Sequence, residues 1–218
     1  MNKKICVIVG AGPGMGLALG KRFAKGEYKI IFVARRLEAL QQYENIMEKE
    51  GYESASFAAD INNFDLLGNI FDRIEEKHGH PHVLIYNASV FRQASPTELQ
   101  PEDLINDFKV NVVGALVSAK KVAPFMKFQK SGTVIFSGGG QGIEPYYGYS
   151  SLGVGKAGIR NLCFSLADEL KPYGIKVGTI TIMGAVKKDT HFDPDLIAEK
   201  FWDLHSQAAE DFQIEIQY

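Results

Sequence analysis

A single lysine, Lys156, lies in a run of small and apolar residues that is typical of the opening turns of a helix, which we expect over residues 151–171. The residue four positions earlier, one turn away on the same side of a helix, is Leu152. A phenol or an alcohol there would form a proton-transfer pair with the ammonium group, whereas leucine has no proton to donate. The nearby side chains that could donate one are Tyr149 and Ser137.

A glycine-rich turn near the start of the chain provides a second kind of chemistry. The segment VGAGPGMG spans Val9–Gly16, between an apolar run and a helical pattern. Glycines at this place let the backbone turn tightly and approach a pyrophosphate, while the free amides of the helix start face the anion. A merely tight connection between strand and helix is the alternative. The residues expected to hold the phosphates are Gly10, Gly12, Gly14, Met15 and Gly16.

Two arginines follow the second apolar run and bear on which dinucleotide would bind. A site for an unphosphorylated ribose needs an acid at the end of the second strand. This chain has Ala34 there, followed by Arg35 and Arg36. Guanidinium groups suit a 2′-phosphate through charge and forked hydrogen bonds. The sequence therefore predicts NADP(H), with NAD(H) disfavoured; a solvated basic helix start is the alternative.

The elements that must position these residues alternate between strand and helix. Short apolar runs bounded by turn residues predict buried parallel strands, and amphipathic stretches between them predict helices. The resulting fold class is α/β, with one doubly wound Rossmann-type domain over residues 1–218 and about seven mostly parallel strands covered by helices on both faces. Strands are expected at 4–10, 28–34, 52–58, 82–88, 132–138, 175–182 and 212–218, and helices at 15–25, 36–50, 63–78, 101–111, 112–128, 151–171 and from Asp193–Pro194 through Trp202.

Composition excludes several classes of protein. A formal net charge of −2 over 218 residues does not favour a nucleic-acid surface. The two cysteines, Cys6 and Cys163, lie in apolar or helical stretches and cannot form a disulfide framework, which fits a reducing, cytoplasmic environment. No apolar run approaches the ~18 residues of a membrane span, so a membrane is not expected as a partner. The nearly balanced charge likewise gives no reason to expect a nucleic acid as a partner.

These features together resemble the short-chain dehydrogenase/reductase family, and the resemblance covers nearly the whole chain. The motifs that carry it are the glycine turn, the segment AADI with Asp60 and Ile61, the segment NAS that begins with Asn87 and Ala88, the segment NVVG that begins with Asn111, and Lys156. The resemblance implies hydride transfer between NAD(P)(H) and a small carbonyl or alcohol substrate. It also implies that Asp60 and Ile61 lie near adenine and that Asn87, Ala88 and Lys156 lie near the ribose.

The same resemblance implies that this chain departs from the catalytic pattern of the family. Its members use a tyrosine as the proton donor, one helical turn before the lysine, with a serine that polarises the carbonyl and an asparagine that supports a water relay. The lysine matches Lys156 and the asparagine matches Asn111, but the tyrosine position holds Leu152 and the serine position falls on Gly139. Two functions follow: an oxidoreductase with an atypical proton donor, or a catalytically inactive dinucleotide-binding sensor or subunit partner.

Tyr149 and Ser137 are the candidates for replacing the missing groups. If the helix includes Tyr149, its phenol lies about 5 Å too far along the axis from Lys156. If Tyr149 lies in the preceding loop, it can fold back over the nicotinamide. Ser137 can offer its hydroxyl if the glycines at 138–140 bend the chain.

Two further expectations concern metals and assembly. The segment HGHPH, which contains His78, His80 and His82, has the alternation of a metal site, but Gly79 and Pro81 argue for a loop and no cysteine or acidic cluster completes a ligand set. We therefore expect no metal. By analogy with the family, we expect a homodimer or homotetramer.

Overall fold

The computed structural model describes residues 3–218 and contains one seven-stranded sheet with the order β3-β2-β1-β4-β5-β6-β7. Every neighbouring pair of strands is parallel. The predicted fold class is thereby confirmed. The strands are β1 (Ile5–Val9), β2 (Lys29–Ala34), β3 (Ser54–Ala58), β4 (Pro81–Tyr86), β5 (Gly132–Gly139), β6 (Ile175–Ile182) and β7 (Glu215–Gln217).

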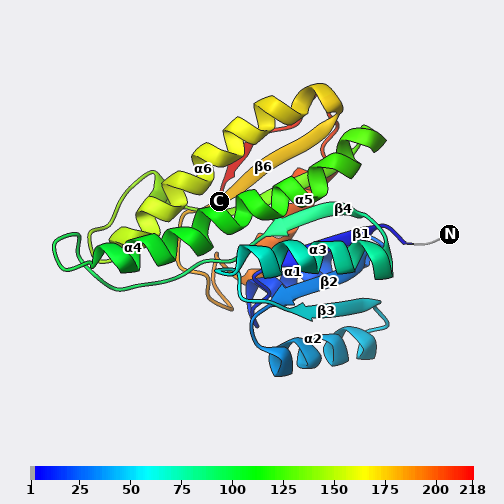
Figure 1. The fold of residues 1–218 in the computed structure, drawn as a ribbon, viewed down its shortest axis with the longest axis horizontal. Helices are drawn as coiled ribbons and strands as arrows, with labels where there is room; N and C mark the ends of the chain where they lie inside the picture. Colours follow the sequence, from blue (N-terminus) through cyan, green and yellow to red (C-terminus); the bar gives the residue numbers. More distant parts are fainter. Residues whose placement is uncertain (1–2) are drawn as a thin grey trace.

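Helices cover both faces of this sheet (Figure 1). One apolar core joins the sheet to α3, α5 and α6, and a second core joins it to α1, α2 and α7. The helices are α1 (Met15–Lys25), α2 (Leu37–Lys49), α3 (Phe64–His78), α4 (Pro101–Phe108), α5 (Gly114–Gln129), α6 (Ser150–Leu170) and α7 (Pro194–Ser206), with the short helical segments η1 (Lys109–Val113), η2 (Gly140–Gly142) and η3 (Lys171–Tyr173).

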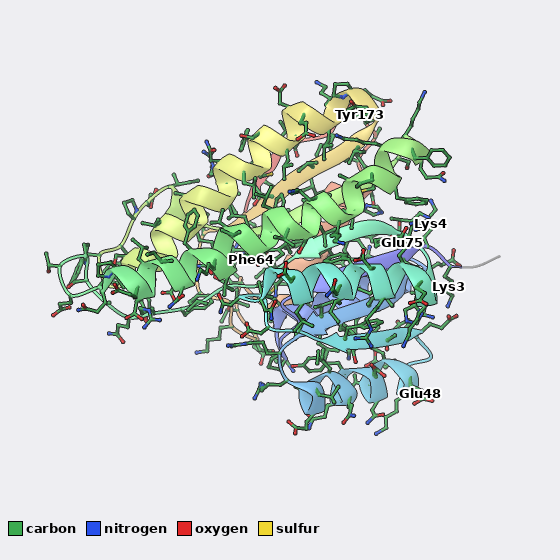
Figure 2. All side chains as sticks on the ribbon, viewed as in Figure 1. Lys3, Lys4, Glu48, Phe64, Glu75 and Tyr173 are labelled. Carbon is green, nitrogen blue, oxygen red and sulfur yellow. The ribbon has the colours of Figure 1, made fainter. Side chains whose placement is uncertain are left out.

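The two cores explain why the central strands are apolar at every position. Successive side chains of a strand point to opposite faces of the sheet. In β1, Val7 and Val9 enter the core beneath α3, α5 and α6, whereas Cys6 and Ile8 enter the core beneath α1, α2 and α7. Charged side chains such as Glu48 lie on the outer surface (Figure 2).

Local capping fixes the start of two helices. Asn63 precedes α3, and its Oδ1 accepts a hydrogen bond of 2.9 Å from the backbone nitrogen of Leu66. Asp193 caps α7 in the same manner, with Oδ1 accepting from the nitrogen of Asp195 at 2.9 Å, and Pro194 occupies the first helical position. The predicted helix start at Asp193–Pro194 is confirmed.

Several predicted boundaries shift by a few residues, such as the end of the last helix at Ser206 rather than Trp202, and two of the differences affect the architecture. The stretches expected as separate helices at 101–111 and 112–128 form one rod, in which the π-helical segment η1 joins α4 to α5 (Figure 1). The last strand is confined to Glu215–Gln217 rather than 212–218. Strand β7 is the edge strand and pairs with β6 alone, so only a short segment is held by the ladder.

Candidate functional site

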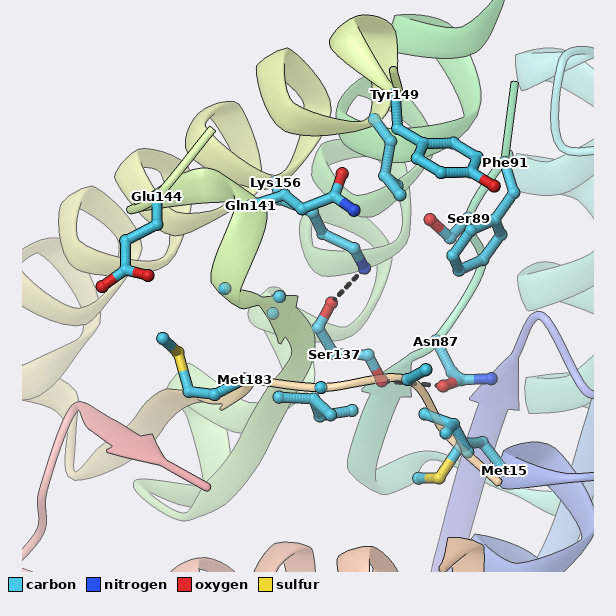
Figure 3. A pocket seen from close by; sticks show the side chains of 18 residues that line it. Met15, Asn87, Ser89, Phe91, Ser137, Gln141, Glu144, Tyr149, Lys156 and Met183 are labelled. Atoms are coloured by element: carbon cyan, nitrogen blue, oxygen red, sulfur yellow. Dashed lines mark hydrogen bonds between the residues drawn. The ribbon is translucent and has the colours of Figure 1, made fainter. Parts of the chain in front are cut away.

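A cavity of about 640 Å³ opens at the carboxyl edge of the sheet (Figure 3). Asn87 follows β4, Ser137 lies near the end of β5, and Met183 follows β6, so three neighbouring strands deliver residues to it. Lys156 extends into the cavity from α6. Tyr149, the residue immediately before that helix, also lines the cavity. Ligands of open α/β sheets bind outside the carboxyl ends of the strands, which makes this cavity the candidate active site.

The glycine turn requires glycine at two positions because backbone segments approach closely there. Gly10 has a φ of +85°, and a Cβ on it would overlap the backbone nitrogen of Ala88. A Cβ on Gly16 would lie 2.6 Å from the Cα of Ala11. A Cβ on Gly12, in contrast, would meet nothing within 4 Å, so open space lies over the middle of the turn.

Helix α1 begins within reach of that open space. Gly14 is its N-cap residue, no side chain caps it, and no acidic residue lies in its first turn. The first amides of a helix have no partner within the helix and attract anions. Met15, the first helical residue, also lines the cavity. The turn therefore fits a phosphate group placed between β1 and α1.

Asn87 links the glycine turn to the floor of the cavity. Its Nδ2 donates to the carbonyl oxygen of Gly10 at 2.9 Å, and its Oδ1 accepts from the hydroxyl of Ser137 at 2.8 Å. The side chains of Asn87 and Ser137, both predicted site residues, are thus brought together. Strand β5 continues through Gly139, so the bend that we considered for the glycine run does not occur before that residue.

Lys156 is buried, with 9% of its surface exposed, and lines the cavity. Its Nζ donates to the carbonyl oxygen of Ser137 at 2.7 Å. Burial lowers the pKa of Lys156 to about 8. Among residues 3–218 it forms no ion pair, so the charge of its ammonium group is not compensated by a carboxylate.

The residue one turn before the lysine brings no polar group into the site. Leu152 lines the cavity and is only 3% exposed. Tyr149 is the N-cap residue of α6, outside the helix, which is the second of the two placements that we considered. Its side chain lines the cavity, and its hydroxyl is directed toward Ser89 and Phe91 rather than toward Lys156 (Figure 3).

Asn111 lies in the π-helical segment η1, behind α6. Its Oδ1 accepts from the backbone nitrogen of Val90 at 2.8 Å, while its buried Nδ2 has no partner among the described residues. A Cβ on Gly155 would lie 2.6 Å from that nitrogen. A π-turn alters the backbone hydrogen bonding locally. The carbonyl oxygen of Val110 in this segment accepts a hydrogen bond from the hydroxyl of Tyr86.

The remaining predicted cofactor residues lie at the ends of β2 and β3, on the same edge of the sheet. Arg35 and Arg36 are exposed, and Arg36 is the N-cap residue of α2. Neither arginine forms an ion pair within residues 3–218. Asp60 is exposed and its Oδ1 accepts from the backbone nitrogen of Asn62, whereas Ile61 is buried.

Sequence reasoning missed two polar groups of the cavity. The hydroxyl oxygen of Ser89 and Oε1 of Gln141 are buried and have no partner in the described part of the chain, although both residues line the cavity. Ser89 belongs to the NAS segment and Gln141 interrupts the glycine run after β5, so both were close to motifs already noted. Their unsatisfied atoms suit polar groups of a ligand.

The histidine-rich segment has structural partners. His80 pairs with Glu75 and stacks on Phe125, and His82 accepts a hydrogen bond from the backbone nitrogen of Ile5 through Nδ1. The described residues contain no group of three or more potential metal ligands. None of the helices over residues 3–218 has the length and apolar character needed to cross a membrane.

Comparisons with known proteins agree with this architecture. An uncharacterised oxidoreductase of Bacillus subtilis (strain 168) is 26% identical over 181 residues, which are 83% of this chain and 70% of the relative. Carbonyl reductase family member 4 of Xenopus laevis is 26% identical over 190 residues, which are 87% of this chain and 78% of the relative.

Solved structures share the fold. A metagenomic short-chain oxidoreductase in complex with NADP superposes with a TM-score of 0.92, covers 100% of this chain and 97% of its own, and is 24% identical. The sequence profile described as short chain dehydrogenase matches residues 4–194. This match runs from β1 to the start of α7 and includes the glycine turn and the cavity that contains Lys156. The chain therefore belongs to the short-chain dehydrogenase family of oxidoreductases.

Proposed function

We propose that this protein is an NADP(H)-dependent oxidoreductase that transfers hydride to or from a small carbonyl or alcohol, with a proton donor other than the tyrosine of the family. The observation that carries the proposal is the shared edge of the sheet. The glycine turn, the uncapped start of α1 and the cavity that contains Lys156 all lie there. When bound, the nicotinamide supplies or accepts the hydride.

The preference for the phosphorylated dinucleotide rests on the end of β2. Arg35 and Arg36 are exposed, have no acidic partner within residues 3–218, and stand beside the glycine turn because β1 and β2 are neighbours. The backbone N–H of Gly10 donates a hydrogen bond of 2.8 Å to the carbonyl oxygen of Val33, which holds the turn against the end of β2. The NADP bound by the metagenomic relative is consistent with this preference.

Each predicted cofactor-binding residue has a proposed role in this arrangement. The open space over Gly12 and the unpartnered polar atoms of Ser89 and Gln141 fit a dinucleotide with its nicotinamide end in the cavity. The proposed contacts are Gly10, Gly12, Gly14, Met15 and Gly16 with the phosphates, Arg35 and Arg36 with the 2′-phosphate, Asp60 and Ile61 with adenine, and Asn87, Ala88 and Lys156 with the ribose.

Around the cavity, the chain supplies apolar walls and fixed backbone segments. Leu152 and Met183 form part of its apolar lining. Asn111 holds the backbone of the segment after β4 through Val90, and Ser137 holds Lys156 through its carbonyl oxygen. Membership of the family supports the proposed substrate class, a small carbonyl or alcohol.

A second candidate function is binding without catalysis, as a sensor or as a subunit partner. The observation that favours it is that Leu152 and Gly139, which the resemblance assigns to the tyrosine and serine positions of the family, carry no hydroxyl group. Of the two serine hydroxyls that line the cavity, that of Ser137 is hydrogen bonded to Asn87, whereas that of Ser89 has no partner among the described residues.

A binding titration tests the cofactor assignment. We expect NADPH to bind more tightly than NADH, and Arg35→Ser with Arg36→Ser to weaken NADPH binding by about 10-fold or more, since hydrogen bonds to charged groups contribute about 1.5–3 kcal/mol each. The double variant should leave NADH binding unchanged. Lys25→Ser, an exposed change at the far end of α1, is the matched control. Equal affinities for both dinucleotides in the unaltered protein would refute the NADP(H) assignment.

A panel of carbonyl substrates with NADPH distinguishes the two functions. Turnover by the unaltered protein supports the oxidoreductase, whereas turnover gained only by Leu152→Tyr with Gly139→Ser would identify a binding protein. A Cβ at position 139 would lie 3.2 Å from methylene carbons of Lys156, so the double variant requires this side chain to shift. The single variant Leu152→Tyr should therefore be assayed beside it.

A further inference from the structure

The cavity contains a cation whose burial is not explained by any acidic partner. Lys156 is the only cationic side chain among the described residues that line the cavity. One of its three N–H groups donates to the carbonyl oxygen of Ser137, and no other hydrogen bond of Nζ is found within residues 3–218. A buried charge without a paired charge is costly, which points to a function for this ammonium group.

Lys156 packs against position 139, which the resemblance assigns to the serine of the family. A Cβ built on Gly139 would stand 3.2 Å from the Cγ, Cδ and Cε atoms of Lys156, so the aliphatic chain lies directly over the glycine backbone. Leu152, which also lines the cavity, carries no hydroxyl group. The ammonium group of Lys156 extends into the cavity toward the carbonyl oxygen of Ser137 (Figure 3) and is the cationic group there among the described residues.

We propose that Lys156 is itself the proton donor to the substrate oxygen, with the Ser137 carbonyl oxygen orienting its ammonium group. This inference rests on the proposed function, in which NADPH is the hydride source. As the carbonyl carbon gains the hydride and its electron pair, the π electrons of the C=O bond move to oxygen, and that oxygen takes a proton from Nζ. The carbonyl is reduced, the nicotinamide is oxidised, and the neutral amine regains a proton from water.

The charged surroundings of Lys156 are compatible with this role. The other ionisable groups that line the cavity are Glu144, after η2, and Tyr149, before α6. On α4, Asp107 is held by Arg92 and by the hydroxyl of Ser151. Burial is the cause that lowers the pKa of Lys156 to about 8, close to the value at which a general acid works well in neutral solution.

The decisive comparison is between Lys156→Arg and Lys156→Ala. Arginine keeps the positive charge and can still hold a ribose, but it cannot release a proton near neutral pH. We expect Lys156→Arg to bind NADPH within about 3-fold of the unaltered protein while its kcat for carbonyl reduction falls at least about 100-fold, the usual contribution of a general acid. Lys171→Arg, an exposed change immediately after the other end of α6, is the matched control.

Amine rescue gives a readout that a ribose-binding role would not move, and an NMR titration checks that Lys156 can release a proton near neutral pH. Added methylamine or ethylamine should restore turnover to Lys156→Ala in proportion to amine concentration, and should not restore it to Lys156→Arg. In protein without cofactor, labelled with carbon-13 at lysine Cε, one NMR signal should titrate well below the other lysines and should be absent from Lys156→Arg. Thermal unfolding of each variant confirms that it folds.

Each contrary result has a distinct meaning. Turnover that Lys156→Arg retains would overturn the inference and leave the proposed oxidoreductase function in place. The same holds if Tyr149→Phe loses turnover while Lys156→Arg stays active. A Lys156 signal that titrates with the surface lysines would overturn it without any activity assay. No turnover by the unaltered protein on any carbonyl, despite NADPH binding, would instead remove the proposed function and the inference together.

Discussion

At the scale of single residues, Gly139 leaves space in the cavity wall for the methylene chain of Lys156. A larger residue there would compete with the methylene chain of Lys156 for the same space. With glycine at 139 and leucine at 152, the buried ammonium group is held by one backbone carbonyl and faces the cavity without a carboxylate. Such a group is costly for the folded protein when no ligand is present.

That cost gives the first prediction. The pKa of Lys156 falls from 10.5 to about 8 on folding. Between these values the unfolded chain binds more protons, so stability should rise as the pH rises from about 8 to 10.5. At pH 7 the full cost is present, and Lys156→Met should be more stable than the unaltered protein by up to about 3 kcal/mol.

Urea unfolding at pH 7 and at pH 10 measures this difference. The advantage of Lys156→Met should shrink at the higher pH, because the lysine of the folded protein is then mostly neutral. A difference that is the same at both pH values would contradict an uncompensated ammonium group.

At the scale of elements, helix α7 is anchored to the sheet by a buried histidine. Nε2 of His205 is hydrogen bonded to the hydroxyl of Tyr28 at 2.9 Å, and Nδ1 to the hydroxyl of Thr133 at 3.0 Å. Burial is the main cause that lowers the pKa of His205 to about 4, and the nearby Lys176 and Lys4 lower it further. The histidine therefore joins α7, in its neutral form, to β5 and to the residue that precedes β2.

Acid should therefore weaken the docking of α7. The unfolded chain binds a proton at His205 from about pH 6.5 downward, whereas the folded chain does so only near pH 4. Stability should fall by about 1–3 kcal/mol as the pH drops through this window, allowing for the partial exposure of the ring. His205→Gln, which keeps a hydrogen-bonding amide but does not titrate, should lose that slope in denaturant unfolding at pH 6.5 and pH 4.5. An unchanged slope would assign the acid sensitivity to other groups.

At the scale of the whole molecule, the helices α4, α5 and α6 lie together on one face of the sheet (Figure 1). Their outer surface carries exposed apolar side chains, namely Ile105, Leu116, Val154 and Phe164. Apolar side chains gathered on one face are typical of contact surfaces between subunits. This face is where we place the contact of the expected homodimer or homotetramer.

The assembly is tested by sedimentation velocity. We expect the unaltered protein to sediment as a dimer or tetramer, and Leu116→Glu with Phe164→Glu to shift it toward the monomer, because two carboxylates would be buried in the contact. Leu196→Glu, an exposed change on α7 across the sheet, is the matched control and should not alter the assembly. A monomer at all concentrations of the unaltered protein would contradict the prediction.

Much of this architecture could be predicted because its signals are local. An apolar run such as Ile5–Val9 must be buried on both faces, and Asp193 before Pro194 specifies a helix start by hydrogen bonding over two residues. The join between α4 and α5 was not predictable in the same way. The π-helical segment around Asn111 depends on partners distant in sequence, such as Val90 and Tyr86.

The sequence alone determined the parallel α/β sheet and the glycine turn between the first strand and the first helix, because strand periodicity and turn chemistry are written in neighbouring residues. Only the tertiary structure decided how the predicted site residues are used. The hydroxyl of Tyr149 points away from Lys156, the hydroxyl of Ser137 is engaged by Asn87, and the lysine lies over Gly139. These contacts join segments from different strands and helices, and packing across the sheet edge, rather than local sequence, fixes their geometry.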